Sequence, residues 1–361
     1  MRAAFVIAAL VSAVGCGPKP MPAPPDSGSP PVHYPVVPNN GGAVLADAEL
    51  VSVTLGPDVG QHAAWLRWLV DSGWLTERAG EYGVTRVTFG GALELPAPPA
   101  EQTDEQLKAS LRTLQPQQGR LYVIWGPPGA AIIDRYGLAT CFTIPGTGYH
   151  EVLDAEEVPY VVVPGCSSRF GGSVDQVQAM HIDGTRLIIN ALTNPSPRNA
   201  PAFALSDSSN VWFALGVEVG DFCWNRIVQR DGQILLRVWS NSAVLADDEP
   251  CLPAPPGPAF GFSVEPAGRR AMVIGEEQQL VVRGWSKGPR EDWLIDVTPW
   301  TGDFGMKATL DKTTLNGDQS AGLSLTVPYP VPRRTQGSVL LRARGGDDSP
   351  LWPISFVVRD P

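Results

Sequence analysis

A proline-rich segment at residues 252–258, Leu-Pro-Ala-Pro-Pro-Gly-Pro, separates two stretches of the chain whose residue patterns differ. Before it, apolar runs typical of strands alternate with runs of helical spacing, whereas after it only short strand-like runs recur. Proline fixes φ and lacks an N–H group, so neither a helix nor the interior of a sheet continues through such a segment. We therefore expect two folded domains, residues 47–252 and residues 259–361, both of ordinary domain size.

The first of these domains combines both periodicities. Strands are predicted at 48–55, 83–89, 121–125 and 158–163, and helices at 61–75, 103–114 and 173–192. Capping-box sequences begin two of the helices, at Thr103 and Ser173, and the last helix ends before Pro195 because the residue preceding a proline avoids the helical region. Gly184 lies inside that helix, where glycine costs about 1 kcal/mol relative to alanine. The pattern predicts an α+β domain with a mixed sheet plus helices.

The second domain reads as all-β. Seven short apolar runs are separated by Gly, Pro, Asp and Asn, near residues 260–264, 279–285, 293–297, 306–310, 323–327, 338–343 and 354–358. About seven short strands with turn signals at this spacing predict an immunoglobulin-like sandwich. The segment contains no cysteine, so the disulfide between the sheets of antibody domains is not expected.

Tryptophan is frequent, with 11 residues in the chain. Trp65 and Trp68 are three residues apart beside Leu69 on a predicted helix, a spacing typical of core packing. In the second domain we expect four tryptophans to fill the core or the sheet edges: Trp285, Trp293, Trp300 and Trp352. A surface that binds carbohydrate stays the alternative for both groups.

The chain begins with the pattern of a bacterial lipoprotein signal. Arg2 precedes an apolar run over residues 3–14, and small residues lead to Cys16, which would become the lipidated first residue of the mature chain. The run holds about a dozen apolar residues where roughly 20 are needed to span a bilayer, which argues against a transmembrane anchor. An ordinary cleaved secretory signal stays open as an alternative. The signal pattern leads us to expect an exported protein, lipid-anchored to the bacterial cell envelope. Gly17 after the cysteine favours the outer membrane over the inner one.

Residues 17–46 hold nine prolines together with Gly, Ser and Asn. Such a composition buries little apolar surface and favours extended, polyproline-like chain. We expect a tether that holds the folded part away from the membrane, at about 3 Å per residue where it is extended.

With Cys16 lipidated, four cysteines remain, namely Cys141, Cys166, Cys223 and Cys251. An even number in an exported chain implies two disulfides, and four cysteines allow three pairings. The sequential pairing, Cys141 with Cys166 and Cys223 with Cys251, closes the shortest loops and is the one we expect. A metal site is the weaker alternative, because no two of these cysteines have a Cys-x-x-Cys spacing.

The chain is acidic, with 27 Lys and Arg against 37 Asp and Glu and a formal net charge of −10. This balance argues against nucleic acid or an anionic membrane surface as the main partner. The expected contact with the membrane is through the lipid anchor.

Several short motifs, taken in their order along residues 45–251, carry a resemblance to a known group of proteins. They lie at Val44–Val51, Trp68–Trp74, Glu81–Gly83, Gly148–Glu151, Thr193–Pro195, Glu218–Cys223 and Val238–Asn241. The set resembles secreted bacterial lipoproteins with the pattern His-Glu-x-x-Glu-x-x-Thr-Asp-Pro, and more distantly the plant exordium or phosphate-induced family. The resemblance implies a zincin-like domain, and in the bacterial relatives a terminal sandwich follows it as an accessory domain for spacing or adhesion.

The resemblance aligns residues 185–195 with the metal-binding helix of that family, but the residues that would bind the metal are absent here. The resemblance would place His at Arg186, Glu at Leu187 and the second Glu at Asn190. A guanidinium does not deprotonate and cannot offer a lone pair to Zn²⁺, and Leu187 lacks the carboxylate of the general base. The downstream acid of the family pattern is retained as Glu218 or Asp221. Arg186 and Asn190 still share one helix face, so the spacing of a metal site survives without its donors.

These substitutions lead us to expect no catalytic residues, no bound metal and no cofactor. We expect Arg186 to pair with Glu218 or Asp221, so that its guanidinium takes the electrostatic place of the cation. A different metal site, built from His150, His181 and Glu218, stays open as an alternative. His181 cannot simply replace a lost ligand, since five residues before Arg186 it falls on another helix face.

The leading functional expectation is therefore a catalytically inactive, metalloprotease-like lipoprotein that acts as a binding or structural module on the cell envelope. Its partner would be an unknown protein or polysaccharide, with no role for nucleic acid. Two alternatives stay open: an active metal-dependent hydrolase with unrecognised ligands, and a carbohydrate or matrix adhesin.

Overall fold

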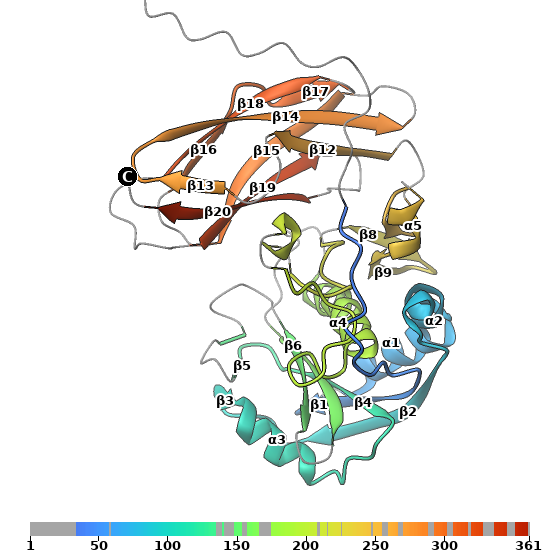
Figure 1. Ribbon diagram of the computed structural model, residues 1–361. Coiled ribbons are helices and arrows are strands. Elements are labelled where there is room, and N and C mark those ends of the chain that lie inside the picture. The colour runs from blue at the N-terminus through green and yellow to red at the C-terminus, as the bar shows by residue number, and fades with distance from the viewer. Residues whose placement is uncertain are drawn as a thin grey trace, which may run out of the picture.

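The computed structural model describes residues 34–359 apart from short gaps at 58, 135–138, 141–147, 154–156, 166–174, 208–209, 215, 225, 247, 255–258, 266–269, 288–291, 302–305, 317–318, 328–335 and 345–350. The predicted signal, Cys16 and residues 17–33 lie outside the described residues. Figure 1 shows the chain as two parts, one of strands and helices and one of strands only.

The first part is built around a five-stranded sheet in the order β2-β1-β4-β7-β6. Its strands are β1 (Asp47–Leu55), β2 (Arg86–Leu95), β4 (Arg120–Trp125), β6 (Tyr149–Leu153) and β7 (Val158–Val163). The four predicted strands are parallel to one another, and β6, which the sequence patterns did not predict, joins β7 antiparallel at one edge. The expectation of a mixed sheet plus helices is confirmed.

The helices of this part are α1 (Val59–Asp71), α2 (Trp74–Ala79), η1 (Gly80–Tyr82), α3 (Asp104–Arg112), α4 (Gln176–Thr193) and α5 (Asn241–Leu245). The single helix predicted over 61–75 was wrong, because Gly73 has a φ of 72° and separates α1 from α2. Among the described residues, none of the helices combines the length and the hydropathy needed to cross a bilayer.

Helix capping agrees with the sequence at α3 and differs at α4. The Thr103 hydroxyl accepts from the Gln106 N–H while the Gln106 side chain accepts from the Thr103 N–H, which is the predicted capping box. At α4 the cap is Asp175, whose carboxylate accepts from the Gln178 N–H, so the predicted start at Ser173 was wrong; Ser173 lies outside the described residues. The helix ends at Thr193, before the predicted Asn-Pro stop.

The central strands β1, β4 and β7 are buried on both faces, which is usual for parallel strands covered by helices, whereas the edge strand β2 is largely exposed. Alternate residues of β1, β4 and β7 pack with α1 and α4 on one face and with α3 on the other. Trp65 is 4% exposed and belongs to the first of these cores, as predicted, and Trp68 is partly buried against it. Gly184 lies in α4 where an added Cβ would be 3.0 Å from the ring of Trp125, so close helix–strand packing explains this glycine.

The chain before β1 packs on the domain, so the predicted tether was too long at its C-terminal end. Val37 is 1% exposed, and its N–H donates to Asn241 Oδ1 at 2.9 Å. The indole N–H of Trp239 donates to the carbonyl of Pro35 at 3.2 Å, and the side chain of Asn40 donates to the Ala204 carbonyl at 2.8 Å. Composition predicted an extended segment here. The backbone carbonyl groups of an extended segment can also accept hydrogen bonds from a neighbouring surface, as Pro35 does.

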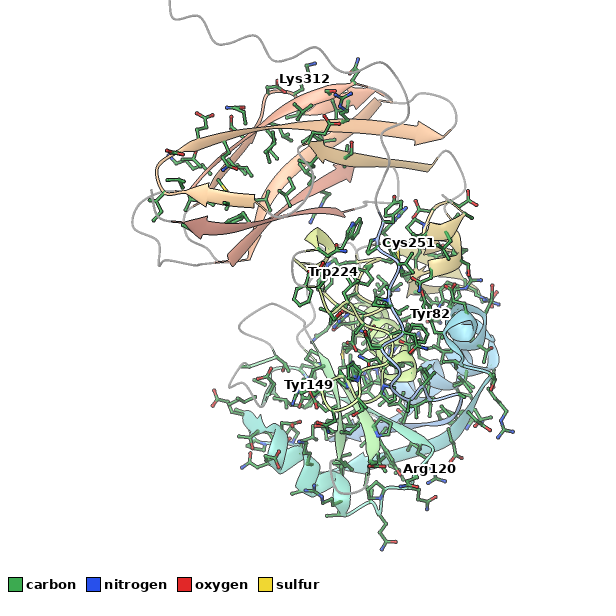
Figure 2. The ribbon with its side chains drawn as sticks, in the orientation of Figure 1. Tyr82, Arg120, Tyr149, Trp224, Cys251 and Lys312 are labelled. Carbon is green, nitrogen blue, oxygen red and sulfur yellow. A yellow bond between two sulfur atoms is a disulfide. The ribbon has the colours of Figure 1, made fainter. Side chains whose placement is uncertain are left out.

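Smaller elements complete the first part: β3 (Glu101–Thr103), β5 (Ala131–Ile133), η2 (Val211–Ala214), β8 (Ile227–Arg230), β9 (Gln233–Leu236), β10 (Val238–Trp239) and β11 (Cys251–Leu252). A disulfide joins Cys223 to Cys251 (Figure 2 labels Cys251), with 5.6 Å between their Cα atoms. This confirms one predicted disulfide; Cys141 and Cys166 lie outside the described residues.

The second part consists of two facing sheets (Figure 1). One has the order β12-β14-β18-β16, formed by β12 (Ala259–Glu265), β14 (Glu277–Lys287), β16 (Lys307–Leu310) and β18 (Ser320–Thr326). The other has the order β13-β20-β19-β15-β17, formed by β13 (Arg270–Val273), β15 (Asp292–Thr301), β17 (Thr314–Asn316), β19 (Gln336–Arg344) and β20 (Leu351–Arg359). All pairs are antiparallel except β13 with β20. The seven predicted runs all fall on strands, and β13 and β17 are additional.

Inward-facing residues from both sheets form a common apolar core, including Phe262, Val282, Leu323, Leu341 and Phe356. The side chains of Trp285, Trp293, Trp300 and Trp352 lie outside the described residues, so their predicted role stays a prediction.

Candidate functional site

A pocket of about 310 Å³ lies between the edge strand β6, the helix α4 and the segment after η2. It is lined by Tyr149, His150 and Glu151 from β6, by Arg186, Leu187 and Asn190 from α4, and by Glu218 and Asp221. The three positions at which the family resemblance places metal ligands therefore face the same pocket as both retained acids.

Arg186 is held between two carboxylates. Its Nε donates to Asp183 Oδ1 at 3.0 Å and its Nη1 donates to Asp221 Oδ1 at 2.8 Å, with 8% of the residue exposed. Burial works to lower the pKa of Arg186, but the two carboxylates outweigh burial and raise it. The ion pair predicted for Arg186 is thus formed with Asp221 and not with Glu218.

Asp183 was not predicted from the sequence. It precedes Arg186 by three residues on α4, and residues three apart lie side by side on a helix surface. This spacing was the signal in the sequence that could have identified it.

Every oxygen of Asp221 already accepts hydrogen bonds. Oδ1 accepts from Arg186 and, at 3.0 Å, from the Asn190 amide, while Oδ2 accepts from the backbone N–H groups of Val217 and Glu218 at 3.2 Å each. The other end of the Asn190 amide accepts from the Gly220 N–H at 2.7 Å. Asn190 therefore fixes both a carboxylate and the loop that carries it, and Asp221 has little capacity left for a cation.

The loop approaches α4 so closely that Gly220 has no room for a side chain. A Cβ at this position would lie 2.5 Å from the carbonyl oxygen of Arg186 and 2.6 Å from Asn190 Oδ1. The glycine lets the Glu218–Asp221 segment reach the helix, which is a close approach that only this residue permits.

Glu218 is paired with His150. The imidazole Nε2 lies 2.8 Å from Glu218 Oε2, and Glu218 Oε1 also accepts from the side chain of Asn194 at 2.5 Å. His150 is 6% exposed. Burial is the largest single influence and lowers its pKa, but the charge and hydrogen bond of Glu218, together with the charges of Glu151 and Asp221, outweigh burial and raise the pKa. Asn194, which belongs to the Thr-Asn-Pro motif, thus positions the retained acid as well as ending the helix.

The alternative cluster of His150, His181 and Glu218 is only partly brought together. His181 projects from a different part of α4 and contacts His62 on α1, with 3.3 Å between His62 Nδ1 and His181 Nε2. The structure thus pairs the two candidate histidines with different partners.

A second polar group borders the pocket at α3. Asp104 Oδ1 accepts from the hydroxyls of Tyr149 (Figure 2) and Tyr160 at 2.6 Å each, and Lys108 Nζ lies 3.2 Å from Asp104 Oδ2. Burial, followed by the charge of Asp104, raises the pKa of Tyr149 well above its ordinary value. Both tyrosines therefore stay protonated and act as hydrogen-bond donors. The sequence patterns did not identify this group, because its members come from three separate elements.

The side chains at the family's metal positions do not fit a zinc ion. Arg186 is a fixed cation, Leu187 is apolar, and the Asn190 oxygen is engaged by Gly220. Within the described part of the chain, no three His, Cys, Asp or Glu side chains are arranged to hold a metal ion.

Comparisons with known proteins identify no family for this chain. No family model matches the chain, and no curated protein matches it. Solved structures that match include domains 4 and 5 of the S-layer protein SbsC, with 10% identity over 28% of this chain and 53% of that one and a TM-score of 0.23. A family 123 glycoside hydrolase from Clostridium perfringens matches with 12% identity over 28% of this chain and 27% of that one, with a TM-score of 0.23. The periplasmic chaperone SfaE matches with 14% identity, over 28% and 58%, with a TM-score of 0.20. The chain spans about half of the SbsC fragment, and likenesses at these TM-scores do not bear on function.

Proposed function

We propose that this chain is a catalytically inactive, metalloprotease-like lipoprotein that acts as a binding or structural module on the bacterial cell envelope. The observation that carries the proposal is the position of Arg186 between Asp183 and Asp221 in the pocket. A positive charge is already present where the family resemblance places a metal ligand, and it is neutralised by acids on both sides.

The surrounding hydrogen bonds support the same conclusion. Asp221 accepts four donors, and Glu218 accepts from His150 and Asn194. Binding Zn²⁺ would require these carboxylates to exchange protein donors for the ion and would bring the ion close to a guanidinium. These contacts suit a pocket that stabilises the packing of α4 against the Glu218–Asp221 segment, or that binds a polar group, better than one that activates water.

The finer fold assignments belong to this proposal. For a zincin-like first domain, the supporting features are the parallel sheet with one antiparallel edge strand, β6, and the helix α4 beside it that presents positions 186 and 190 to the pocket. For an immunoglobulin-like second domain, the support is two facing, largely antiparallel sheets with one apolar core. Export and lipid anchoring rest on the sequence pattern that ends at Cys16.

A cleavage assay tests the absence of catalysis. The purified full chain is incubated with unfolded casein and with a mixed peptide library, with and without added Zn²⁺, beside the Glu218→Gln variant. We expect no cleavage that depends on Glu218 or on zinc. Zinc-dependent turnover that is lost in Glu218→Gln would overturn the proposal.

A second assay addresses binding. The intact chain is incubated with purified cell-wall polymer and with envelope proteins from a bacterium, beside the Arg186→Met variant. Because Arg186→Met is expected to be destabilised, circular dichroism first establishes that the variant is folded under the assay conditions. Retention of the wild-type chain that is weakened in the folded variant then supports a pocket-dependent module, whereas equal retention of both would exclude the pocket as the binding site.

An active hydrolase is the second candidate, and one observation favours it. His150 lies in the pocket with Glu218 at 2.8 Å, an arrangement that could serve as a base or as part of a ligand set. Against this, Nε2 is used by Glu218, and Nδ1 of the same ring is buried, with no hydrogen-bond partner in the described structure. The cleavage assay distinguishes the two candidates.

A further inference from the structure

The five-stranded sheet ends in a long edge strand, β2, which pairs with β1 on its inner side only among the described strands. It lies at the rim of the first part, away from the second part (Figure 1). Strands are typically about five or six residues long, and exposed edges are commonly protected by lysine or proline. β2 has 10 residues and contains neither lysine nor proline, and Leu93 on it is 36% exposed. The outer N–H and C=O groups of β2 therefore offer a template for a further strand.

Two adjacent glycines divide this edge in the middle. β2 has one residue more than the facing part of β1, and the extra residue, Gly90, forms a bulge. Regular pairing with β1 holds on both sides of the bulge, over Arg86–Phe89 and over Gly91–Leu95. Neither glycine has a side chain that would hold another strand away from the middle of the edge.

The pairing with β1 shows which side chains of β2 share a face of the sheet. The partners of four residues are alternate residues of β1, from Ala48 to Thr54, and Leu50 among them belongs to the core beneath α1 and α4. The four residues on the α1 face of β2 are therefore Val87, Phe89, Ala92 and Glu94. Because opposite side chains of antiparallel strands lie on the same face, a second strand must pair in a register that keeps these residues together.

A symmetric antiparallel pairing of two β2 strands meets this condition. With Gly90 of one copy opposite Gly91 of the other, each end of the strand faces the opposite end of its neighbour. Val87 then lies opposite Glu94 of the second copy, with both side chains on the face of α1. The two bulges meet at the symmetry axis and leave regular strand on both sides of it.

Arg67 on α1 supplies a charge complementary to Glu94. It lies over the ring of Phe89, 4.6 Å from the centroid, and lines a groove of about 410 Å³ between α1 and the edge, together with Val87. Neither Arg67 nor Glu94 forms an ion pair with another described residue. In the symmetric register, Glu94 of the second copy enters this groove beside Arg67, and the same contact recurs on the other side of the axis.

We propose that β2 is a self-association surface, through which two copies of this chain pair edge to edge and join their sheets, with Arg67 of each copy beside Glu94 of the other. The proposal is independent of what the pocket binds, because the pocket is lined by β6, at the opposite edge of the sheet. Both pockets therefore stay clear of the contact.

Sedimentation equilibrium of the purified full chain over a range of concentrations measures the association. The wild type is compared with Arg67→Glu, Glu94→Lys, the double variant, and Glu276→Lys as a control at an exposed acid of the second part. We expect a reversible wild-type dimer, and a dissociation constant about tenfold higher in Arg67→Glu, where two ion pairs become like-charged pairs. Glu94→Lys should weaken the dimer less, because Asp71 also lines the groove and attracts the new cation.

The double variant restores opposite charges and should dimerise about tenfold more tightly than Arg67→Glu alone, while the control should match the wild type. A wild type that is monomeric at every concentration would overturn the proposal. A double variant no tighter than Arg67→Glu would overturn it as well.

A second measurement locates the contact without a variant. Amide hydrogen exchange of the wild type is followed by mass spectrometry in dilute and in concentrated samples. We expect peptides from Arg86–Leu95 to exchange more slowly in the concentrated sample, because the outer N–H groups of β2 become bonded between copies, while peptides from β6 exchange alike in both. Exchange of β2 that does not depend on concentration, or protection confined to other strands, would contradict the self-association surface.

Discussion

The guanidinium of Arg186 lies 2.8 Å from the carboxylate of Asp221, and both groups are buried in the wall of the pocket. Asp183 flanks the guanidinium from the other side at 3.0 Å. Asp183, Arg186 and Asp221 together carry a net negative charge. Hydrogen bonds from Asn190 and from backbone N–H groups to Asp221 help to stabilise this charge. This arrangement makes Arg186 a structural requirement of the pocket, and the first prediction follows from it.

Replacing Arg186 by Met should destabilise the chain strongly. The substitution keeps most of the side-chain volume but leaves Asp183 and Asp221 buried without their cation, a change that typically costs about 3–5 kcal/mol. Urea unfolding at pH 7 measures the loss. The matched control is Arg86→Met, which removes an exposed ion pair with Asp47 and should change the free energy of unfolding far less. A loss no larger than that of the control would show that the Arg186 pairs are not needed.

Replacing Gly220 by Ala should separate the Glu218–Asp221 loop from α4. The added Cβ would lie 2.5 Å from the Arg186 carbonyl, so the loop must move and lose the Asn190 hydrogen bond. We expect a loss of about 1–3 kcal/mol. Gly60→Ala is the control, because no atom lies within 4 Å of a Cβ there, and in the first turn of α1 it should be neutral or slightly stabilising. Thermal unfolding of the two variants provides the comparison, and equal midpoints would exclude the predicted collision.

The His150–Glu218 pair should make the stability of the folded chain depend on pH. The pKa of His150 is raised in the folded chain, so its contribution is fully present below about pH 6.5 and is lost as pH rises through the folded-state pKa. Glu218→Gln removes the charge that raises this pKa. Between pH 6 and pH 9 the free energy of unfolding should fall more steeply in the wild type than in Glu218→Gln. The opposite order of slopes would contradict the assignment.

The disulfide between Cys223 and Cys251 should contribute substantially to stability. It closes a segment with a sequence separation of 28, and both cysteines are almost fully buried. The double variant Cys223→Ala/Cys251→Ala should lose about 3–4 kcal/mol, the value expected for a loop of this length. Urea unfolding under non-reducing conditions measures it. The native disulfide should also resist mild reductant until the chain unfolds, and rapid reduction of the folded chain would argue against this burial.

The sequence predicted the elements whose patterns are local. Strand β1 has an alternating pattern, β4 and β7 have almost wholly apolar runs, and α3 has its own capping box, so each could be recognised without knowledge of its neighbours. The edge strand β6 was missed because its centre is His150 and Glu151, which are polar yet buried. Their burial depends on Glu218 and Arg198, which lie 68 and 47 residues away along the chain. Such long-range pairing leaves no periodic pattern.

The site was predictable to the extent that spacing along one helix defines it. Arg186 and Asn190 were expected on one face of α4, and an ion pair with a retained acid was expected and is present with Asp221. The choice of Asp221 over Glu218 was not predictable, because it depends on how the loop turns at Gly220. The cluster of Asp104 with two tyrosines could not be predicted from the sequence either, since its members come from α3, β6 and β7.

The zinc content of the purified chain tests the central claim most directly. The full-length protein is incubated with excess Zn²⁺, dialysed against a mild chelator and analysed for metal by mass spectrometry, beside the Glu218→Gln variant. Because Arg186 occupies the position of a ligand and Asp221 has no free oxygen, we predict far less than one zinc ion per chain, with no difference between the two proteins. One zinc ion per wild-type chain that is lost in Glu218→Gln would contradict the account.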